Sequence, residues 1–236
     1  MRNDDPGAGR RNVSLRSPTY AVRAPLARWL REEARLAAQR ERKPRLLDIG
    51  CGVKPYEPFF RGAVAEYVGV DVVENPAADL QGAVESLPVE DASFDLVLCV
   101  QVLEHADDPA QAVRELRRVV APGGAVLAST HGVQVYHPAP VDLWRWTHAG
   151  LDRLFRENAD WSSLSVRPSS GTTACLGMLV AIYADLLARR VHLAPLGRAV
   201  VAGLNRGAAA LDRRSTDLSE PRSGSLIANL HVVAEP

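Results

Sequence analysis

The most informative stretch of the chain is Leu46–Gly52, which reads Leu-Leu-Asp-Ile-Gly-Cys-Gly. Its branched apolar residues are typical of the end of a buried parallel strand, and Asp48 and the glycines predict a tight turn before the next helix. Gly50 and Gly52 allow the backbone to approach a ligand closely. In an open α/β sheet, that ligand lies outside the carboxyl ends of the strands, where the strand order reverses. The stretch therefore predicts a loop that binds a nucleotide-type cofactor.

The residues that follow the turn separate two classes of cofactor. A dinucleotide-binding fingerprint needs Gly-x-Gly-x-x-Gly, or Ala at the last position, at the start of a helix. In this chain the last position of the pattern is Pro55. The sequence therefore disfavours a pyrophosphate loop, and with it a dehydrogenase.

Composition limits the classes of protein further. The 236 residues suffice for one sizeable domain, or one domain with an appendage, and 47% of them are hydrophobic. The net charge is zero, so no global field attracts nucleic acid. The three cysteines form no Cys-x-x-Cys pair, and the first residues lack the apolar segment of a signal peptide. We expect a cytoplasmic protein with neither structural disulfides nor a metal site.

Apolar runs and helical spacing alternate along the chain. The pattern predicts a disordered start up to about residue 18, and a helix over 20–39. Asp108 and Thr147 are expected to cap two further helices. Strands are predicted at 45–49, 67–72, 94–100, 125–130, 164–167 and 227–234, and two helices are inserted at about 171–215. This order predicts an α/β fold with a doubly wound parallel sheet and a helical insertion before the last strand.

Several ordered stretches carry a family resemblance. They are Leu46–Gly52, Gly69–Asp71, Glu85–Pro88 with Ser93–Val97, Val102–His105, and Arg114–Leu116 with Pro122–Gly124. Together they resemble the type 11 (UbiE-like) branch of class I S-adenosylmethionine (SAM) methyltransferases, densely over 45–131 and loosely elsewhere. The resemblance implies a Rossmann-like, mostly parallel seven-stranded sheet with helices on both faces. It also implies an N-terminal tail and lid-like helix over 1–40 and a methyltransferase domain over 41–236.

The same resemblance implies which residues bind SAM. The glycine loop would meet the methionine carboxylate with its N–H groups, and Asp48 would order that loop or contact the methionyl amine. Asp71 would accept hydrogen bonds from the two ribose hydroxyls. One departure is Ala83, which stands where many relatives have an acidic residue that bonds the adenine amine. The residues expected to bind the cofactor are Asp48, Gly50, Cys51, Gly52, Asp71, Val72, Ser86, Leu87, Val100 and His105.

The stretch 130–146 is the most individual part of the chain, since it combines histidines, tryptophans, a tyrosine and an aspartate. It follows the fifth strand and should overhang the methyl donor. A hydroxyl acceptor must lose its proton, and histidine suits that role near neutral pH. His131 and His137 are therefore the candidate catalytic bases, unless both only satisfy backbone groups. We expect His105 to order the cofactor loop, and Asp142 to pair with Arg145.

These features favour a SAM-dependent methyltransferase that acts on a small-molecule acceptor, with a hydroxyl of a secondary metabolite or glycan precursor as the expected target. Two alternatives stay open. A nucleic-acid methyltransferase is disfavoured because the fourth strand is not followed by an Asn/Asp-Pro-Pro-aromatic motif. The intact motifs do not exclude a non-catalytic SAM-binding partner protein, because a fold does not dictate its function. The uncharged stretch 168–184 is too polar for a confident membrane span, so we expect it to cover the acceptor pocket, with peripheral membrane contact as the lesser alternative.

Overall fold

A single mixed sheet organises the protein. The computed structural model describes residues 5–138, 140–215 and 220–236. Within these residues, the strands lie in the order β3-β2-β1-β4-β5-β7-β6. Strand β7 runs antiparallel to β5 and β6, and all other neighbours are parallel. The strands are β1 (Arg45–Ile49), β2 (Glu66–Asp71), β3 (Leu80–Gln81), β4 (Phe94–Val100), β5 (Val120–His131), β6 (Ser163–Pro168) and β7 (Asn229–Glu235).

This arrangement confirms the predicted doubly wound, mostly parallel seven-stranded sheet. Two details differ from the prediction. Strand β3 has only two residues, too few for a periodic pattern. Strand β5 begins at Val120 rather than Ala125, because Pro122–Gly124 interrupts the pairing with β4 as a bulge instead of ending it.

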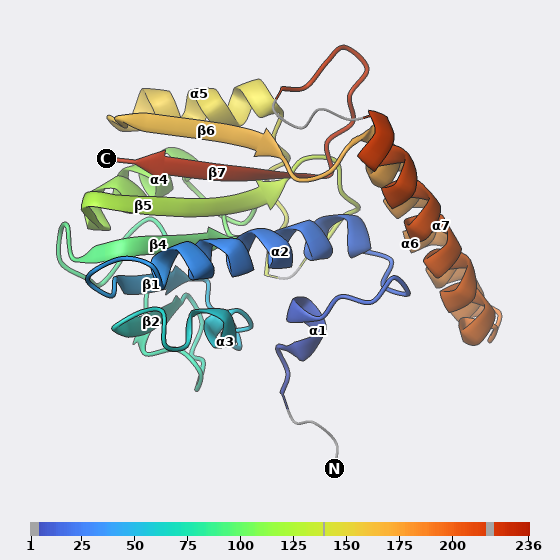
Figure 1. Ribbon diagram of the computed structural model, residues 1–236, viewed down its shortest axis with the longest axis horizontal. Coiled ribbons are helices and arrows are strands. Elements are labelled where there is room, and N and C mark those ends of the chain that lie inside the picture. The colour runs from blue at the N-terminus through green and yellow to red at the C-terminus, as the bar shows by residue number, and fades with distance from the viewer. Residues whose placement is uncertain (1–4, 139, 216–219) are drawn as a thin grey trace.

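Helices cover both faces of the sheet (Figure 1). Helices α2 (Tyr20–Ala37) and α3 (Glu57–Phe60) lie on one face, and α4 (Pro109–Val119) and α5 (His148–Asn158) lie on the other. Since successive strand residues point to opposite faces, Leu46 packs in the α2 layer and Leu47 in the α4 layer. Both leucines are fully buried, so the start of the cofactor loop is fixed from two sides.

Side-chain caps fix the beginnings of two of these helices. The N–H of Gln111 donates to Asp108 Oδ1 at 3.0 Å, and the N–H of Gly150 donates to Thr147 Oγ1 at 3.0 Å. Each bond satisfies one of the donors that a helix start leaves free. Both predicted caps are confirmed.

The start of the chain is more ordered than predicted. Residues 1–4 lie outside the described residues, but 5–18 are placed and include the short helix α1 (Ala8–Arg11). Arg11 Nη1 donates to Pro55 O at 2.6 Å. Asn205 Nδ2 donates to the carbonyls of Leu15 and Ser17, both at 2.8 Å. The prediction of disorder was wrong because local polarity says nothing about partners that are distant in sequence.

The predicted insertion is a helical hairpin between β6 and β7. Helix α6 (Thr172–Arg190) and helix α7 (Ala194–Ser215) pack along each other. The hairpin begins at the edge formed by the carboxyl ends of β1, β4, β5 and β6 and extends beyond the sheet (Figure 1). Its base packs on the body, where Cys175 and Met178 meet Val22, Val135 and Ala228, and Asn205 in the middle of α7 bonds the start of the chain. The first turns of α6 thus pack beside Val135 of the 130–146 stretch, and the prediction that this segment covers the acceptor pocket stays a prediction.

Candidate cofactor and acceptor site

The turn after β1 has the backbone conformation that its glycines predicted. Gly50 and Gly52 have φ of +64° and +51°, in the left-handed region that favours glycine. A Cβ on Gly50 would lie 2.5 Å from Cγ2 of Val102, whereas a Cβ on Gly52 would meet nothing within 4 Å. The N–H of Cys51 donates to Val70 O at 3.0 Å and ties the turn to β2. Gly50 is therefore required by conformation and by space, and Gly52 by conformation alone.

Asp71 ends β2 beside this turn. Its Oδ2 accepts hydrogen bonds from the N–H of Gly52 at 3.1 Å and from Asn75 Nδ2 at 2.9 Å. Asn75 Nδ2 also donates to Gly52 O at 2.7 Å. No described residue donates to Oδ1 of Asp71. The carboxylate is thus held in place by one oxygen, and the other can accept a hydrogen bond from a ligand.

Asp48 lies beneath the turn and is buried. Its Oδ2 accepts a hydrogen bond of 2.6 Å from the Tyr67 hydroxyl. Burial raises the pKa of Asp48 to about 7, although the bond from Tyr67 and the charge of Lys54 act in the opposite direction. Cys51 is also buried, and its thiol pKa is raised to about 12, mainly by burial, so the thiol is neutral. The Asp48 side chain therefore bonds Tyr67 in the interior below the turn and is not exposed to solvent.

The segment expected beside the adenine divides into exposed and buried residues. Val72 is 53% exposed at the end of β2, and Ser86 is exposed in a turn closed by its N–H to Ala83 O at 3.0 Å. Leu87 is buried in the core, and its N–H donates to Glu115 Oε2 at 2.8 Å. Val100 is half-buried at the end of β4. Val72 and Ser86 are therefore available to a ligand, whereas Leu87 shapes the segment from within.

Sequence reasoning missed a polar network at the ends of the central strands. Gln101 follows β4 with φ of +57°, and its Nε2 donates to Ser129 Oγ at 3.0 Å and Asn229 Oδ1 at 2.9 Å. Asn229 Nδ2 donates to Ser129 Oγ at 2.7 Å. A left-handed non-glycine residue that is held by several bonds is common at functional sites. The available signal was a polar residue next to or near one end of each of three apolar strands: after β4, near the end of β5 and at the start of β7.

A second missed residue is Glu104, which is fully buried next to His131. The Thr130 hydroxyl donates to Glu104 Oε2 at 2.7 Å. His131 Nε2 lies 3.3 Å from Glu104 Oε1, but without the alignment of a hydrogen bond. Burial raises the pKa of Glu104, and burial together with the charge of Arg145 lowers the pKa of His131 to about 4. At neutral pH His131 is therefore an uncharged imidazole.

Polar atoms without partners gather beside this pair. Glu104 Oε1, His131 Nδ1 and Trp146 Nε1 are buried and have no hydrogen-bond partner among the described residues. Buried polar groups are almost always satisfied, by water or ligand where the protein supplies nothing. The region where β5 ends thus has the donor and acceptor atoms that a polar ligand would satisfy.

The stretch 130–146 is held against the end of β4 by several bonds. Arg145 forms a two-pronged ion pair with Asp142, as predicted, and donates to Val135 O at 3.0 Å. The N–H groups of Leu143 and Trp144 both donate to Glu104 O at 3.1 Å. The described parts of the stretch, 130–138 and 140–146, are therefore held in place by hydrogen bonds and an ion pair.

The three histidines of interest lie at this end of the sheet. The ring centroids of His105 and His137 are 6.2 Å apart, and His105 Nδ1 bonds Val141 O. The N–H of His137 donates to Asp142 Oδ2 at 2.8 Å, and its side chain is exposed. Among the residues that the structure describes, no group of three or more His, Cys, Asp or Glu side chains could hold a metal ion.

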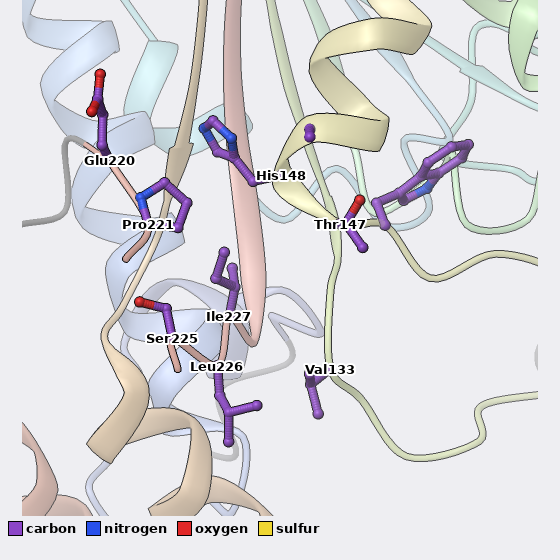
Figure 2. Close-up of a pocket in the computed structure, with 10 residues that line it drawn as sticks. Val133, Thr147, His148, Glu220, Pro221, Ser225, Leu226 and Ile227 are labelled. Atoms are coloured by element: carbon purple, nitrogen blue, oxygen red, sulfur yellow. The ribbon is translucent and has the colours of Figure 1, made fainter. Parts of the chain in front are cut away.

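A pocket of about 580 Å³ lies next to this loop (Figure 2). Its walls come from the loop, the start of α5 and the segment before β7, and include Val133, Trp146, His148 and Ile227. Figure 2 shows His148 and Ser225 among the side chains that line it. The volume is in the range of small-molecule sites. His131 and His137 do not line it, although the N–H of Trp146 donates to His131 O at 2.9 Å.

Comparison with known proteins agrees with this geometry. A family model described as a methyltransferase domain matches residues 21–163. The chain belongs to this methyltransferase-domain family. The assignment confirms the resemblance to class I, type 11 methyltransferases and indicates SAM as the cofactor.

This methyltransferase-domain protein is similar to two curated relatives and one solved structure, each over a stated part of its length. It is 31% identical over 131 residues to a ubiquinone biosynthesis O-methyltransferase of Pseudomonas aeruginosa, covering 48% of this chain and 53% of the relative. It is 31% identical over 140 residues to a malonyl-[acyl-carrier protein] O-methyltransferase of Erwinia billingiae, covering 53% and 56%. The chain thus spans about half the length of the curated relatives it matches. The YcgJ protein of Bacillus subtilis shares the fold, with a TM-score of 0.51, 20% identity and coverage of 87% and 97%.

Proposed function

We propose that this protein transfers a methyl group from SAM to an oxygen of a small-molecule acceptor, with a hydroxyl of a secondary metabolite or glycan precursor as the target class. The observation that carries the proposal is the contact between the left-handed turn at Gly52 and the carboxylate of Asp71. That contact places the glycine turn beside the carboxylate that ends β2, at the edge of the sheet where the carboxyl ends of the parallel strands meet. The family assignment and the two O-methyltransferases among its relatives support it.

The residues present fit the cofactor. Asp71 Oδ1 has no hydrogen-bond partner among the described residues, Val72 and Ser86 are exposed, and a Cβ on Gly52 would meet nothing within 4 Å. Asp71 would accept hydrogen bonds from the ribose hydroxyls of SAM, and the glycine turn would lie close to the methionine portion of SAM. When bound, SAM supplies an electrophilic methyl group. Asp48 would act indirectly, because its carboxyl group bonds Tyr67 beneath the turn.

The structure favours His137 over His131 as the acceptor's base. His131 is buried, and a pKa of about 4 makes it a weak proton acceptor. The His137 side chain is exposed, and its backbone is fixed through Asp142 and Arg145. His131 would then position the loop 130–146, and its Nδ1 would form a hydrogen bond with a polar substituent of the acceptor. Most of the acceleration would come from holding the acceptor in line with the methyl group and excluding water.

The lid function of residues 1–40 stays part of this proposal. Arg11 contacts Pro55 directly beyond the glycine turn, and Arg10 and Arg23 are close enough to influence the pKa values of Asp48 and Tyr56. The described part of this segment, 5–40, therefore lies beside the residues proposed to bind the cofactor. A cytoplasmic location stays a prediction.

Calorimetric titration with SAM and with S-adenosylhomocysteine tests the proposal. Micromolar binding of both ligands, followed by transfer of label from methyl-labelled SAM to catechol as a hydroxyl probe, would support it. Failure of both ligands to bind the folded protein would overturn it. Binding without transfer to any acceptor would favour the non-catalytic alternative, and salt-sensitive transfer to RNA would favour a nucleic-acid methyltransferase.

A further inference from the structure

The hairpin α6–α7 is a tightly packed unit. Met178 and Ala181 of α6, and Val201 and Ala208 of α7, are buried. A Cβ on Gly177 would lie 3.0 Å from Cβ of Ala208, and a Cβ on Gly197 would collide with Cβ of Ala188. Glycines at these positions let the two helices approach closely, so the hairpin forms a compact arm that extends beyond the sheet (Figure 1).

The outward face of α6 is apolar and exposed. Leu176, Val180, Tyr183 and Leu187 recur at helical spacing on the side opposite the packed face, and they are 48%, 56%, 66% and 63% exposed. No charged residue occurs in α6 before Asp185. Large exposed apolar surfaces mark interaction sites in soluble proteins, so this face requires a partner.

The tip of the hairpin combines apolar and basic side chains. Val191, Leu193 and Leu196 are each more than half exposed there. Arg189, Arg190 and Arg198 flank them, and the nearby acid, Asp185, is buried and bonded to Arg189 at 2.7 Å. The other described acid of the hairpin, Asp212, lies at the base, where it accepts from the N–H of Gly171. The exposed charge at the tip is therefore positive.

We propose that the hairpin α6–α7 docks on the surface of an anionic lipid bilayer. The apolar face of α6 and the tip would enter the headgroup region, and the arginines would bind anionic headgroups. Helix α6 is the helix of the described chain that could cross a membrane by length and composition. It does not span, because it is paired along its length with α7, which carries Arg198, Asn205 and Arg206.

A second copy of the chain is the competing occupant. Helices that pair through an apolar stripe use flanking charges to set partner and register. The stripe from Leu176 to Tyr183 has no such charges on α6, whereas the basic tip has a complement in an anionic surface. The charge distribution therefore favours an anionic lipid surface over a second copy of the chain as the partner of the hairpin. The hairpin begins at the same sheet edge as the loop 130–146, so docking would bring that edge toward the bilayer, whether or not the protein transfers methyl groups.

Co-sedimentation with vesicles tests this proposal. We would compare phosphatidylglycerol vesicles with phosphatidylcholine vesicles, at low and high salt. One variant, Tyr183→Gln with Leu187→Gln, removes exposed apolar groups, and a second, Arg190→Gln with Arg198→Gln, removes charge. The matched control is Leu36→Gln with Arg40→Gln at the exposed end of α2. Circular dichroism and sedimentation velocity would show that each variant is folded and report its oligomeric state.

The expected result is binding of the wild type and the control to phosphatidylglycerol vesicles, weaker by at least about tenfold for phosphatidylcholine. The apolar variant should lose binding to both vesicles, and the arginine variant should lose the preference for phosphatidylglycerol. Absence of vesicle binding by the wild type would overturn the proposal. A dimer that the apolar variant converts to monomer, together with absence of vesicle binding, would assign the face to a second copy instead.

Discussion

The backbone N–H of Gly52 donates a hydrogen bond of 3.1 Å to the carboxylate of Asp71, across 19 residues of sequence. This bond connects the turn after β1 with the end of β2, and no residue in the described part of the chain donates to Asp71 Oδ1. The backbone of the turn therefore helps to hold the orientation of the carboxylate. An acceptor that the protein itself holds in place reduces the entropy lost when a ligand binds.

The first prediction concerns Asp71. Replacing it with alanine should weaken binding of SAM and S-adenosylhomocysteine by at least about tenfold, since hydrogen bonds to a charged group contribute about 1.5–3 kcal/mol. Isothermal titration measures this. Asp107→Ala, at an exposed aspartate on another loop, is the control and should bind as the wild type does. Equal affinity of Asp71→Ala and wild type would remove Asp71 from the site.

The second prediction concerns Gly50. Gly50→Ala should destabilise the fold by about 1–3 kcal/mol, because its φ is +64° and the new methyl group would collide with Val102. Adding Val102→Ala to Gly50→Ala should remove the collision but not the backbone strain of an alanine at positive φ. Gly203→Ala in α7, where a Cβ meets nothing within 4 Å, should instead be neutral or stabilising by up to about 1 kcal/mol. Urea denaturation compares the three variants, and equal effects at Gly50 and Gly203 would contradict the structure.

The third prediction follows from the raised pKa of Asp48. The folded protein holds this proton more tightly than the unfolded chain, so its contribution to stability is present below pH 3.8 and is lost as the pH rises toward about 7. Asp48→Asn keeps an oxygen acceptor for Tyr67 and removes the charge. The variant should therefore exceed the wild type in stability at pH 8, by a few kcal/mol at most, and match it near pH 3.8.

Denaturant titrations at several pH values test this difference between Asp48→Asn and the wild type. A pH-independent difference would show that Asp48 has the same pKa in the folded and unfolded chains, and would contradict the raised pKa. If SAM binding also falls in this variant, Asp48 contacts the cofactor directly instead of supporting the turn.

The fourth prediction distinguishes the two candidate bases. His137→Gln should lower kcat by about 10²–10⁴-fold and leave SAM binding unchanged, which is the usual effect of removing a general base. His131→Asn should mainly raise KM for the acceptor, because its Nδ1 would serve as a positioning group. If His131 were the base, activity would decline only as the pH falls toward about 4. If His137→Gln reacted at the wild-type rate, His137 would be excluded as the general base.

The sequence by itself determined the layered α/β fold and the place of the cofactor turn. Leu46 and Leu47 alternate between two cores, and the glycines at 50 and 52 permit a left-handed turn that other residues disfavour. The physical reasons are local periodicity and local backbone sterics. The caps at Asp108 and Thr147 are also local, and the sequence predicted them correctly.

Only the tertiary structure decided which groups are buried together. The lowered pKa of His131, the burial of Glu104 beside it and the network of Gln101 with Asn229 depend on strands far apart in sequence. The ordered start of the chain likewise depends on Asn205, nearly two hundred residues away. Helical spacing could predict α6, but not which of its faces would pack on α7 and which would be left exposed. Burial and electrostatics are properties of the assembled fold, and so they govern which of the predicted residues can do chemistry.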